Sequence, residues 1–420
     1  MSEGDSHPSN PGQFHATLTE FTAACLAALH DESRDTRKLA VRVLGALACS
    51  SLDEGGREFT AEAPAVLQGL KACLVNASAD TKISAADALG AMAESSLPGV
   101  VAAYAAAMPG VAGCLVACLR DSHNVLRGHA AAALAQLAGS PHAGIATVIA
   151  GVVPGIVDGL MACVVERSEV CRRSAGRSLV AIACSPHAVV GQALASVLPQ
   201  PVHVMVECLD DSWEWIRATA ITTLGGMAGS PHSSVAAVYA AAIPRIIPVL
   251  LVRVHDDSTA IRRSVPVAFA NVSRSSHPEV AAALASVLPS VLHGLQACLC
   301  DTDMWVRRKA VAALESIAAS THDEVFAVHV EGLPCVISSL VACLRDEDAG
   351  VQAYAAQALG GIAGSLQAGV RSTVISGHAQ ELVLDGLLAC TGAESERAAT
   401  AATTALSQIK ARLGVDGGYG

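Results

Sequence analysis

Histidine and cysteine, which bind zinc and iron in proteins, recur along this chain at intervals of 45 residues or multiples of 45. A metal ion needs several ligands about 2 Å away, whereas equivalent residues of stacked helices lie about 10 Å apart. A disulfide needs Cα atoms within about 7 Å. We therefore expect partly exposed histidines at helix starts, buried core cysteines, and no metal site or disulfide in either column. The two columns are His7, His142, His187, His232, His277 and His322, and Cys73, Cys118, Cys163, Cys208, Cys298 and Cys343.

Catalytic signatures are missing from the sequence. Cys114 and Cys118 lie four residues apart, and Cys298 and Cys300 two apart, but neither pair has a second pair at zinc-site spacing. The chain contains neither a glycine-rich phosphate loop nor a Gly-x-Ser-x-Gly nucleophile motif. We expect a protein that is not an enzyme and that holds no metal or cofactor.

The same interval governs other residue types, which indicates a repeat protein. An acidic or amide residue is followed six positions later by a base, and seven positions after that by a large apolar residue. Seven prolines share the period: Pro64, Pro109, Pro154, Pro199, Pro244, Pro289 and Pro334. The acid–base pairs include Asp121 and Arg127, Glu166 and Arg172, Asp211 and Arg217, Asp256 and Arg262, and Asp301 and Arg307. The apolar column is Leu44, Leu89, Leu134, Leu179, Leu224, Phe269, Leu314 and Leu359.

The period divides the chain into nine units within a single array over residues 5–409, with tails at 1–4 and 410–420. The units start near residues 5, 50, 95, 140, 185, 230, 275, 320 and 365. The last unit departs from the pattern, as expected of a terminal repeat that has no neighbour on one side.

One unit, residues 140–184, predicts two helical arms. Ser140 is a good N-cap, and Pro141 suits the first helical position. Pro154 should stop or kink the first arm, because proline has no N–H and its ring clashes with the preceding turn. The arm then continues to about Val165, and the second arm starts near Val170 after a polar turn.

These patterns resemble the HEAT and armadillo repeat superfamily over the whole chain. The resemblance rests on Asp301 with Val306-Arg307, on Ala313-Leu314 with Ala318, and on Gly151-Val-Val-Pro154. It implies an all-α fold, a right-handed α-solenoid of nine repeats, with the acid–base pairs forming a structural ladder along the turns. About twelve residues separate the proline from the acid, one helical turn more than is usual in the family, so the choice between HEAT and armadillo stays open.

Charge and composition exclude some partners. The formal net charge is −11, which disfavours a broad phosphate-binding surface, and we expect no nucleic-acid binding. Residues 100–119 carry no charge and are long enough for a membrane span, but equivalent positions elsewhere hold charged residues, so we expect no membrane insertion. The N-terminus has no secretory pattern, and we expect a reducing compartment, the cytoplasm, with the nucleus as the alternative.

Two sets of side chains are candidates for binding a partner protein. Trp213, Trp215 and Trp305 all fall in turns between helices, where they would either anchor a partner or cap the core. Four basic residues come directly after bases of the acid–base pairs or one position further on, and no column of the repeat offers them an acidic partner. We expect them to face solvent, where they would either bind an acidic or phosphorylated segment of a partner or only be hydrated. These residues are Arg173, Arg263, Arg308 and Lys309.

The sequence therefore predicts a non-catalytic scaffold or adaptor that binds a partner protein along the concave face of the solenoid. Two alternatives are an importin-like transport receptor or a ribosome-associated HEAT receptor. A lyase or metal hydroxylase of HEAT type is disfavoured, since the chain has no His-Glu dipeptide of the kind those hydroxylases use.

Overall fold

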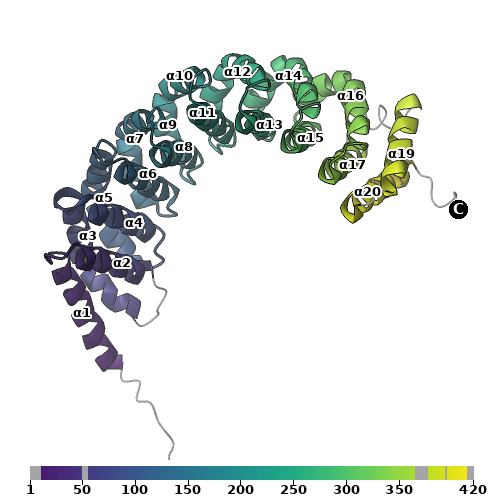
Figure 1. Ribbon diagram of the computed structural model, residues 1–420. Coiled ribbons are helices and arrows are strands. Elements are labelled where there is room, and N and C mark those ends of the chain that lie inside the picture. The colour runs from purple at the N-terminus through teal and green to yellow at the C-terminus, as the bar shows by residue number, and fades with distance from the viewer. Residues whose placement is uncertain (1–10, 50–54, 365–376, 393–394, 414–420) are drawn as a thin grey trace, which may run out of the picture. The chain divides into compact units, whose positions relative to one another are not determined.

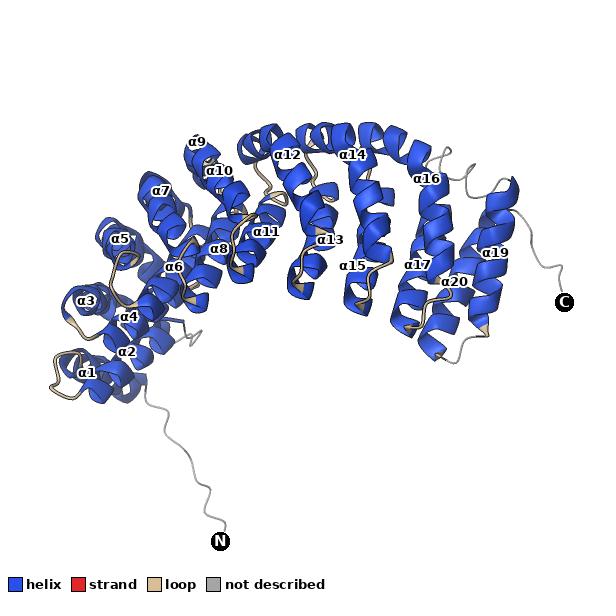
Figure 2. Ribbon diagram, turned by 45° about the horizontal axis from the view of Figure 1, so that its top comes forward, coloured by secondary structure: helices blue, strands red, loops and turns tan. Residues whose placement is uncertain are grey.

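The computed structural model describes residues 11–49, 55–364, 377–392 and 395–413. Throughout these ranges the regular structure is helical, with no strand, which confirms the all-α prediction (Figure 2). His7, the expected tail at 1–4 and the expected unit starts near 5, 50 and 365 lie outside the described residues. The described helices follow one another in the order expected of nine two-helix repeats, as the period predicts.

Contacts divide the chain into two compact units, Met1–Pro201 and Val202–Gly420. In the first unit the helices alternate between two layers (Figure 1). The first-helix layer is α1 (Pro11–Ala28), α3 (Gly55–Asn76), α5 (Pro98–Cys118), α7 (Ala143–Val164) and α9 (Ala188–Val197). The second-helix layer is α2 (Arg34–Cys49), α4 (Ala79–Met92), α6 (Asn124–Gly139) and α8 (Glu169–Ala183).

The second unit repeats this arrangement, and the boundary between the units falls within α10 (Pro199–Cys208). Its first-helix layer includes α12 (Ser233–Arg253), α14 (Pro278–Leu299), α16 (Asp323–Cys343) and α19 (Gly377–Thr391). Its second-helix layer is α11 (Glu214–Met227), α13 (Thr259–Ser273), α15 (Met304–Ala318), α17 (Ala349–Gly364) and α20 (Glu396–Leu413).

The core lies between the two layers. All eight members of the apolar column, from Leu44 to Leu359, are 0 % exposed. The six column cysteines are buried and form no disulfide, which confirms their interpretation as core residues. Burial raises the pKa of Cys118 and Cys208 to about 11 and that of Cys298 and Cys343 to about 12, so these thiols are protonated at neutral pH.

The prediction that the column proline breaks the first arm is wrong in six of the seven repeats. Pro154 lies inside the continuous helix α7, and only Pro199 separates two helices, α9 and α10. All seven column prolines are exposed. Proline leaves the carbonyl four residues earlier without its helical donor, and on a solvent-facing side water can hydrate that carbonyl. The two predicted arms of a repeat are therefore present, and the first arm is one continuous helix in these six repeats.

The predicted start of the first arm is also wrong. The N-cap of α7 is His142, and Pro141 precedes the helix. Ser140 ends α6 instead, where it is fully buried. Its hydroxyl donates to the Ala93 carbonyl at 2.7 Å, in the preceding repeat, and accepts the His142 N–H at 3.3 Å. A serine engaged in this way is not available to cap the helix that follows.

The column histidines are half-buried N-caps, as expected, and they also join neighbouring repeats. In four of them Nε2 lies within hydrogen-bond distance of a serine carbonyl 47 residues earlier, which is possible when Nε2 carries a proton. The pairs are His142–Ser95 (2.9 Å), His187–Ser140 (2.9 Å), His277–Ser230 (2.9 Å) and His322–Ser275 (3.0 Å). Sequence reasoning missed this contact, although the recurrence of Ser-x-His signalled it.

Four helices of the described chain are long and apolar enough to cross a bilayer, judged by length and composition alone. They are α5, α7, α12 and α14, and between 33 % and 44 % of the most apolar window of each is buried. All four belong to first-helix layers. There α5, α7 and α14 each pack between two first-layer helices, α12 packs against α14, and every one of the four also contacts a second-layer helix. The absence of membrane insertion stays a prediction.

Replacing Pro154 by alanine should stabilise the first unit. The substitution restores a helical N–H and removes a residue that costs about 3 kcal/mol in a helix interior, less about 1 kcal/mol for the looser unfolded chain. We expect the free energy of unfolding to rise by roughly 1–2 kcal/mol, with slower amide exchange in α7. A fall in stability would show that the ring of Pro154 makes contacts that this account omits.

Candidate functional site

The turns between paired helices hold the acid–base column, and in the second unit each base first binds its own turn. The Nη1 atom of each arginine donates to the backbone carbonyl of the aspartate six residues earlier. The bonds are Arg217–Asp211 (2.8 Å), Arg262–Asp256 (3.0 Å) and Arg307–Asp301 (2.9 Å). The arginine thus satisfies a carbonyl that the helix end leaves without a donor.

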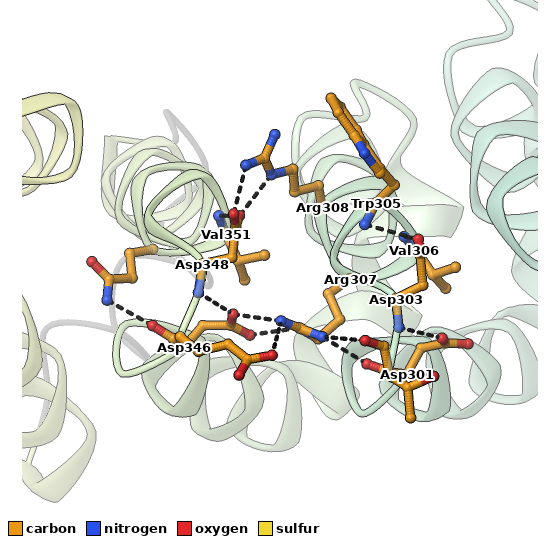
Figure 3. A network of polar contacts seen from close by, with 12 residues as sticks. Asp301, Asp303, Trp305, Val306, Arg307, Arg308, Asp346, Asp348 and Val351 are labelled. Carbon is orange, nitrogen blue, oxygen red and sulfur yellow. Dashed lines mark hydrogen bonds and ion pairs between the residues drawn. The ribbon is translucent and has the colours of Figure 1, made fainter. Parts of the chain in front are cut away.

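The same guanidinium also reaches the carboxylate of the following turn, 39 residues later (Figure 3). The pairs are Arg217–Asp256 (2.7 Å), Arg262–Asp301 (2.6 Å) and Arg307–Asp346 (2.7 Å). Each aspartate in turn accepts the N–H of the residue two positions on, at 2.8 Å for both Asp301 and Asp346. One arginine therefore connects two successive turns, and we call this series the turn ladder.

Burial makes the turn ladder more than a set of surface ion pairs. The side chain of Asp256 is 3 % exposed and that of Arg217 11 %. Burial alone would raise the pKa of Asp256, but hydrogen bonds from Arg217 and the Ser258 N–H outweigh it and lower that pKa. The carboxylate is therefore charged in the folded protein at neutral pH.

The turn ladder extends into the first unit with weaker members. Lys82 lies 3.1 Å from Asp121, and Arg127 lies 3.0 Å from Glu166. Arg127 and Arg172 donate to their own-turn carbonyls, at Asp121 (2.7 Å) and Glu166 (2.6 Å). In the second unit, the base column ends in an amide instead of a base, Gln352. Its side chain still donates to the Asp346 carbonyl, at 2.7 Å.

Two of the basic residues expected to lack a partner form a second ladder, so that expectation is wrong for them. Arg263 binds both carboxylate oxygens of Asp303, at 2.9 and 2.6 Å. Arg308 binds Asp348 in the same way, at 2.7 and 2.8 Å (Figure 3). We call these two pairs the second ladder. Such bidentate pairs neutralise the strip that was expected to receive an acidic segment.

The second ladder forms where an aspartate stands 40 residues after the base. For Arg173 that position holds Trp213, and Arg173 pairs instead with Glu169 on its own helix, where both side chains are about 60 % exposed. Lys38 occupies the same column, and its position 40 residues on holds Ser78. Lys309 is exposed on α15.

Asp303 has two roles, because it also caps α15. Its Oδ1 accepts the N–H groups of Trp305 at 3.0 Å and Val306 at 3.1 Å. The hydrogen bonds from Arg263 contribute most to lowering the pKa of Asp303, which falls to about 2. Asp348 caps α17 in the same way, through Val351 at 2.8 Å.

The three tryptophans lie on this turn side of the second unit, and we call them the Trp edge. Trp213, Trp215 and Trp305 are 50 %, 51 % and 42 % exposed, so each ring is about half covered. The guanidinium carbon of Arg308 lies 4.6 Å from the centre of the Trp305 ring (Figure 3). Arg308 is itself held by Asp348, which fixes one side of the Trp305 ring.

Gly350 leaves the room that this arrangement needs. A Cβ at Gly350 would lie 2.3 Å from the guanidinium carbon of Arg308, closer than real Cβ atoms approach. The guanidinium of Arg308 is therefore packed against a backbone that carries no side chain at that point. In the described part of the chain, no group of three His, Cys, Asp or Glu side chains is arranged to hold a metal ion.

Comparisons with known proteins agree with this architecture. Residues 168–365, less than half of the chain, match the family described as sister chromatid cohesion protein PDS5. No curated protein sequence matches the chain. The structure is similar to importin β, with a TM-score of 0.62 and 16 % identity over 98 % of this chain and 53 % of importin β.

Two further solved structures are similar over nearly the whole chain. Kap121p has a TM-score of 0.57 and 17 % identity over 97 % of this chain and 38 % of its own. An engineered protein has a TM-score of 0.49 and 21 % identity, over 93 % of this chain and 98 % of its own. The chain thus spans about half of importin β or less than half of Kap121p. It has the α-solenoid fold of HEAT and armadillo repeat proteins.

Truncating Asp256 to alanine should destabilise the second unit by about 3 kcal/mol, because it leaves Arg217 buried without its carboxylate. All three tryptophans lie in this unit, so urea unfolding followed by tryptophan fluorescence reports on it directly. The control is Glu347→Ala, whose carboxylate is 85 % exposed and 3.3 Å from Arg307; its cost should stay within about 1 kcal/mol. Equal costs for the two variants would contradict the role given to burial.

Replacing Asp303 by asparagine should remove the ion pair with Arg263 and keep the cap of α15, since asparagine caps helices about as well as aspartate. The folded-state pKa of about 2 lies below the ordinary value of 3.8, so the pair stabilises the fold above about pH 4 and is lost as the pH falls toward 2. We expect wild type to be more stable than the variant at pH 6 and the difference to shrink between pH 4 and pH 2. A difference independent of pH, measured by urea unfolding, would contradict the account.

Proposed function

We propose that this protein is a non-catalytic scaffold that binds a partner protein, with the Trp edge as a principal contact in the second unit. The Trp edge carries the proposal. Aromatic residues make up only 3 % of the chain, yet its three tryptophans each expose about half of their surface on the turn side of one unit. Tryptophan is enriched at the energetic centres of protein interfaces.

The surroundings of Trp305 support a binding role over a purely structural one. Arg308 supports the ring on one side, and Asp348 orients Arg308, so the indole needs little further ordering when a partner arrives. Met304, next to it in sequence, is 39 % exposed and adds adaptable apolar surface. At the other position, Trp213 and Trp215 lie on either side of the half-buried Glu214.

The expectation of an acidic or phosphorylated partner at the second unit loses its basis, because Arg263 and Arg308 are already paired with carboxylates. The proposal for the Trp edge is therefore an apolar and aromatic contact. The similarity to importin β and Kap121p is a likeness of fold, and a transport or ribosome-associated role stays an untested alternative. A cytoplasmic location likewise stays a proposal, supported by the buried, unpaired thiols.

Affinity capture from source-cell extract tests the proposal through the triple variant Trp213→Ala, Trp215→Ala, Trp305→Ala. We expect at least one protein captured by wild type to be depleted about tenfold or more, since losing an interface tryptophan costs about 2 kcal/mol or more. Circular dichroism and thermal unfolding check that the variant keeps its fold.

A matched control removes an equal number of exposed apolar side chains elsewhere. Val189→Ala, Val252→Ala and Leu388→Ala truncate residues that are 41 %, 59 % and 54 % exposed. This control should capture the same proteins as wild type. The proposal is wrong if the tryptophan variant captures every wild-type partner at an unchanged level, or if the control loses the same partners.

A further inference from the structure

Charge is unevenly distributed between the two layers of the first unit. The second-helix layer, α2, α4, α6 and α8, carries nine Lys or Arg and four Asp or Glu. The described first-helix layer, α1, α3, α5, α7 and α9, carries two Lys or Arg and four Asp or Glu. A chain with a net charge of −11 therefore concentrates its cations on one layer of this unit.

Most of these cations are already engaged. The ladder bases bind turn carbonyls and carboxylates, Arg34 pairs with Asp80, and Arg173 pairs with Glu169. Three remain. Lys38, Arg42 and Arg177 are exposed and have no acidic side chain within 4 Å among the residues that the structure describes. We call these three residues the basic face.

The position of the basic face follows from the repeat. Lys38 belongs to the column of Arg263 and Arg308, but it lacks the aspartate that would pair with it. Arg177 occupies in α8 the position that Arg42 occupies in α2, three repeats earlier. The column of Arg263 and Arg308, which aspartates neutralise in the second unit, therefore keeps one available cation in the first unit, Lys38.

A surface hollow lies between α2 and α4, beside two of these cations. Lys38, Arg42, Ile83, Asp87 and Ala91 contribute to its lining. Gly45 permits the helices to meet there, because a Cβ at this position would lie 2.8 Å from the Cβ of Ala88. The hollow therefore combines a basic rim with a partly apolar lining.

One carboxylate in the hollow is shared with a neighbouring helix. Asp87 contacts Nδ1 of His129 on α6 at 2.6 Å. The hydrogen bond that the ring donates to Asp87 raises the pKa of His129, so the imidazole carries positive charge over a wider pH range than usual. Part of the negative charge of Asp87 is thereby balanced within the protein rather than by Lys38 or Arg42.

We propose that the second-helix layer of the first unit binds a carboxylate-rich, acidic segment of a partner protein, with Lys38, Arg42 and Arg177 pairing to its Asp and Glu side chains. This inference rests on the proposed function and specifies the chemistry of the partner. Complementary charge at exposed positions raises association rates and selects among partners, even where each pair adds little affinity.

The spacing of the cations favours several carboxylates over a single phosphate. Lys38 and Arg42 are one helical turn apart on α2, about 6 Å, whereas Arg177 lies three layers further on, about 30 Å at 10 Å per layer. A phosphate group binds where donors converge on one point. An extended segment reaches about 3.3 Å per residue, so about ten residues with acidic side chains at both ends would cover the basic face.

Nucleic acid fits this surface poorly. Binding to a phosphate backbone draws on about six to ten basic contacts. The basic face offers three unpaired cations, and the turn ladder already uses Arg37, Lys82, Arg127 and Arg172. The acidic character of the rest of the chain opposes the approach of a polyanion more than that of a short acidic segment.

A random 16-residue peptide library displayed on phage tests the inference with the full-length protein. We expect the peptides selected by wild type to be enriched at least about threefold in Asp and Glu over the unselected library, with binding that weakens as salt rises. The triple variant Lys38→Glu, Arg42→Glu, Arg177→Glu should bind a selected acidic peptide at least about tenfold more weakly, since each pairing becomes a repulsion. The matched control Lys71→Glu, Arg120→Glu, Arg345→Glu makes the same charge change at exposed positions outside the second-helix layer and should bind the peptide like wild type.

Several other results of these experiments would overturn the inference. Selected peptides without acidic enrichment, or equal binding by wild type and the Lys38, Arg42 and Arg177 variant, would overturn this inference while leaving the proposal for the Trp edge untouched. Selection of peptides only after serine phosphorylation of the library, or tighter binding of a 30-nucleotide single strand at the same face, would also overturn it. Loss of peptide binding in the tryptophan variant alone would assign recognition to the Trp edge and contradict the basic face.

Discussion

The structure depends on one interaction that is repeated along it: an arginine in the turn ladder binds the backbone carbonyl of its own turn and the carboxylate of the next. In Arg307 the guanidinium meets the Asp301 carbonyl at 2.9 Å and the Asp346 carboxylate at 2.7 Å. The conformation of a turn and its stacking on the following repeat are therefore set by the same side chain. Because these groups are largely buried, loss of one partner leaves a desolvated charge, a much larger penalty than loss of an exposed pair.

This constraint also decides which cations remain available for binding. In the second unit, aspartates 40 residues after Arg263 and Arg308 convert the neighbouring column into a second ladder and position Trp305. In the first unit no such aspartate follows Lys38, and the column keeps its charge. The two units share one architecture but offer different surfaces, aromatic in one and basic in the other. A scaffold built this way varies its binding surface through single residues in the turns and keeps its core unchanged.

The repeat period is visible in the sequence because every unit repeats the same packing problem, so the fold and the core could be predicted directly. The column from Leu44 to Leu359 is fully buried, as its spacing predicts. Prediction failed where local rules compete with surroundings. Pro154 lies within a helix at an exposed position, where water can hydrate the carbonyl that the proline leaves without a donor. Ser140 does not cap α7, because its hydroxyl donates to the Ala93 carbonyl of the preceding repeat. The sequence did not reveal the partners of Arg263 and Arg308. Each arginine binds an aspartate 40 residues later, and only the geometry of the turns shows that residues at this separation meet.

A double-mutant cycle at Arg262 and Asp301 tests the coupling between successive repeats most directly. The free energy of unfolding of the second unit would be measured by urea titration and tryptophan fluorescence for wild type, Arg262→Ala, Asp301→Ala and the double variant. We predict an interaction free energy of about 1–3 kcal/mol between the two side chains, well above the additivity error of about 0.3–0.5 kcal/mol. Costs that add within that error would show that the pair does not hold neighbouring repeats together.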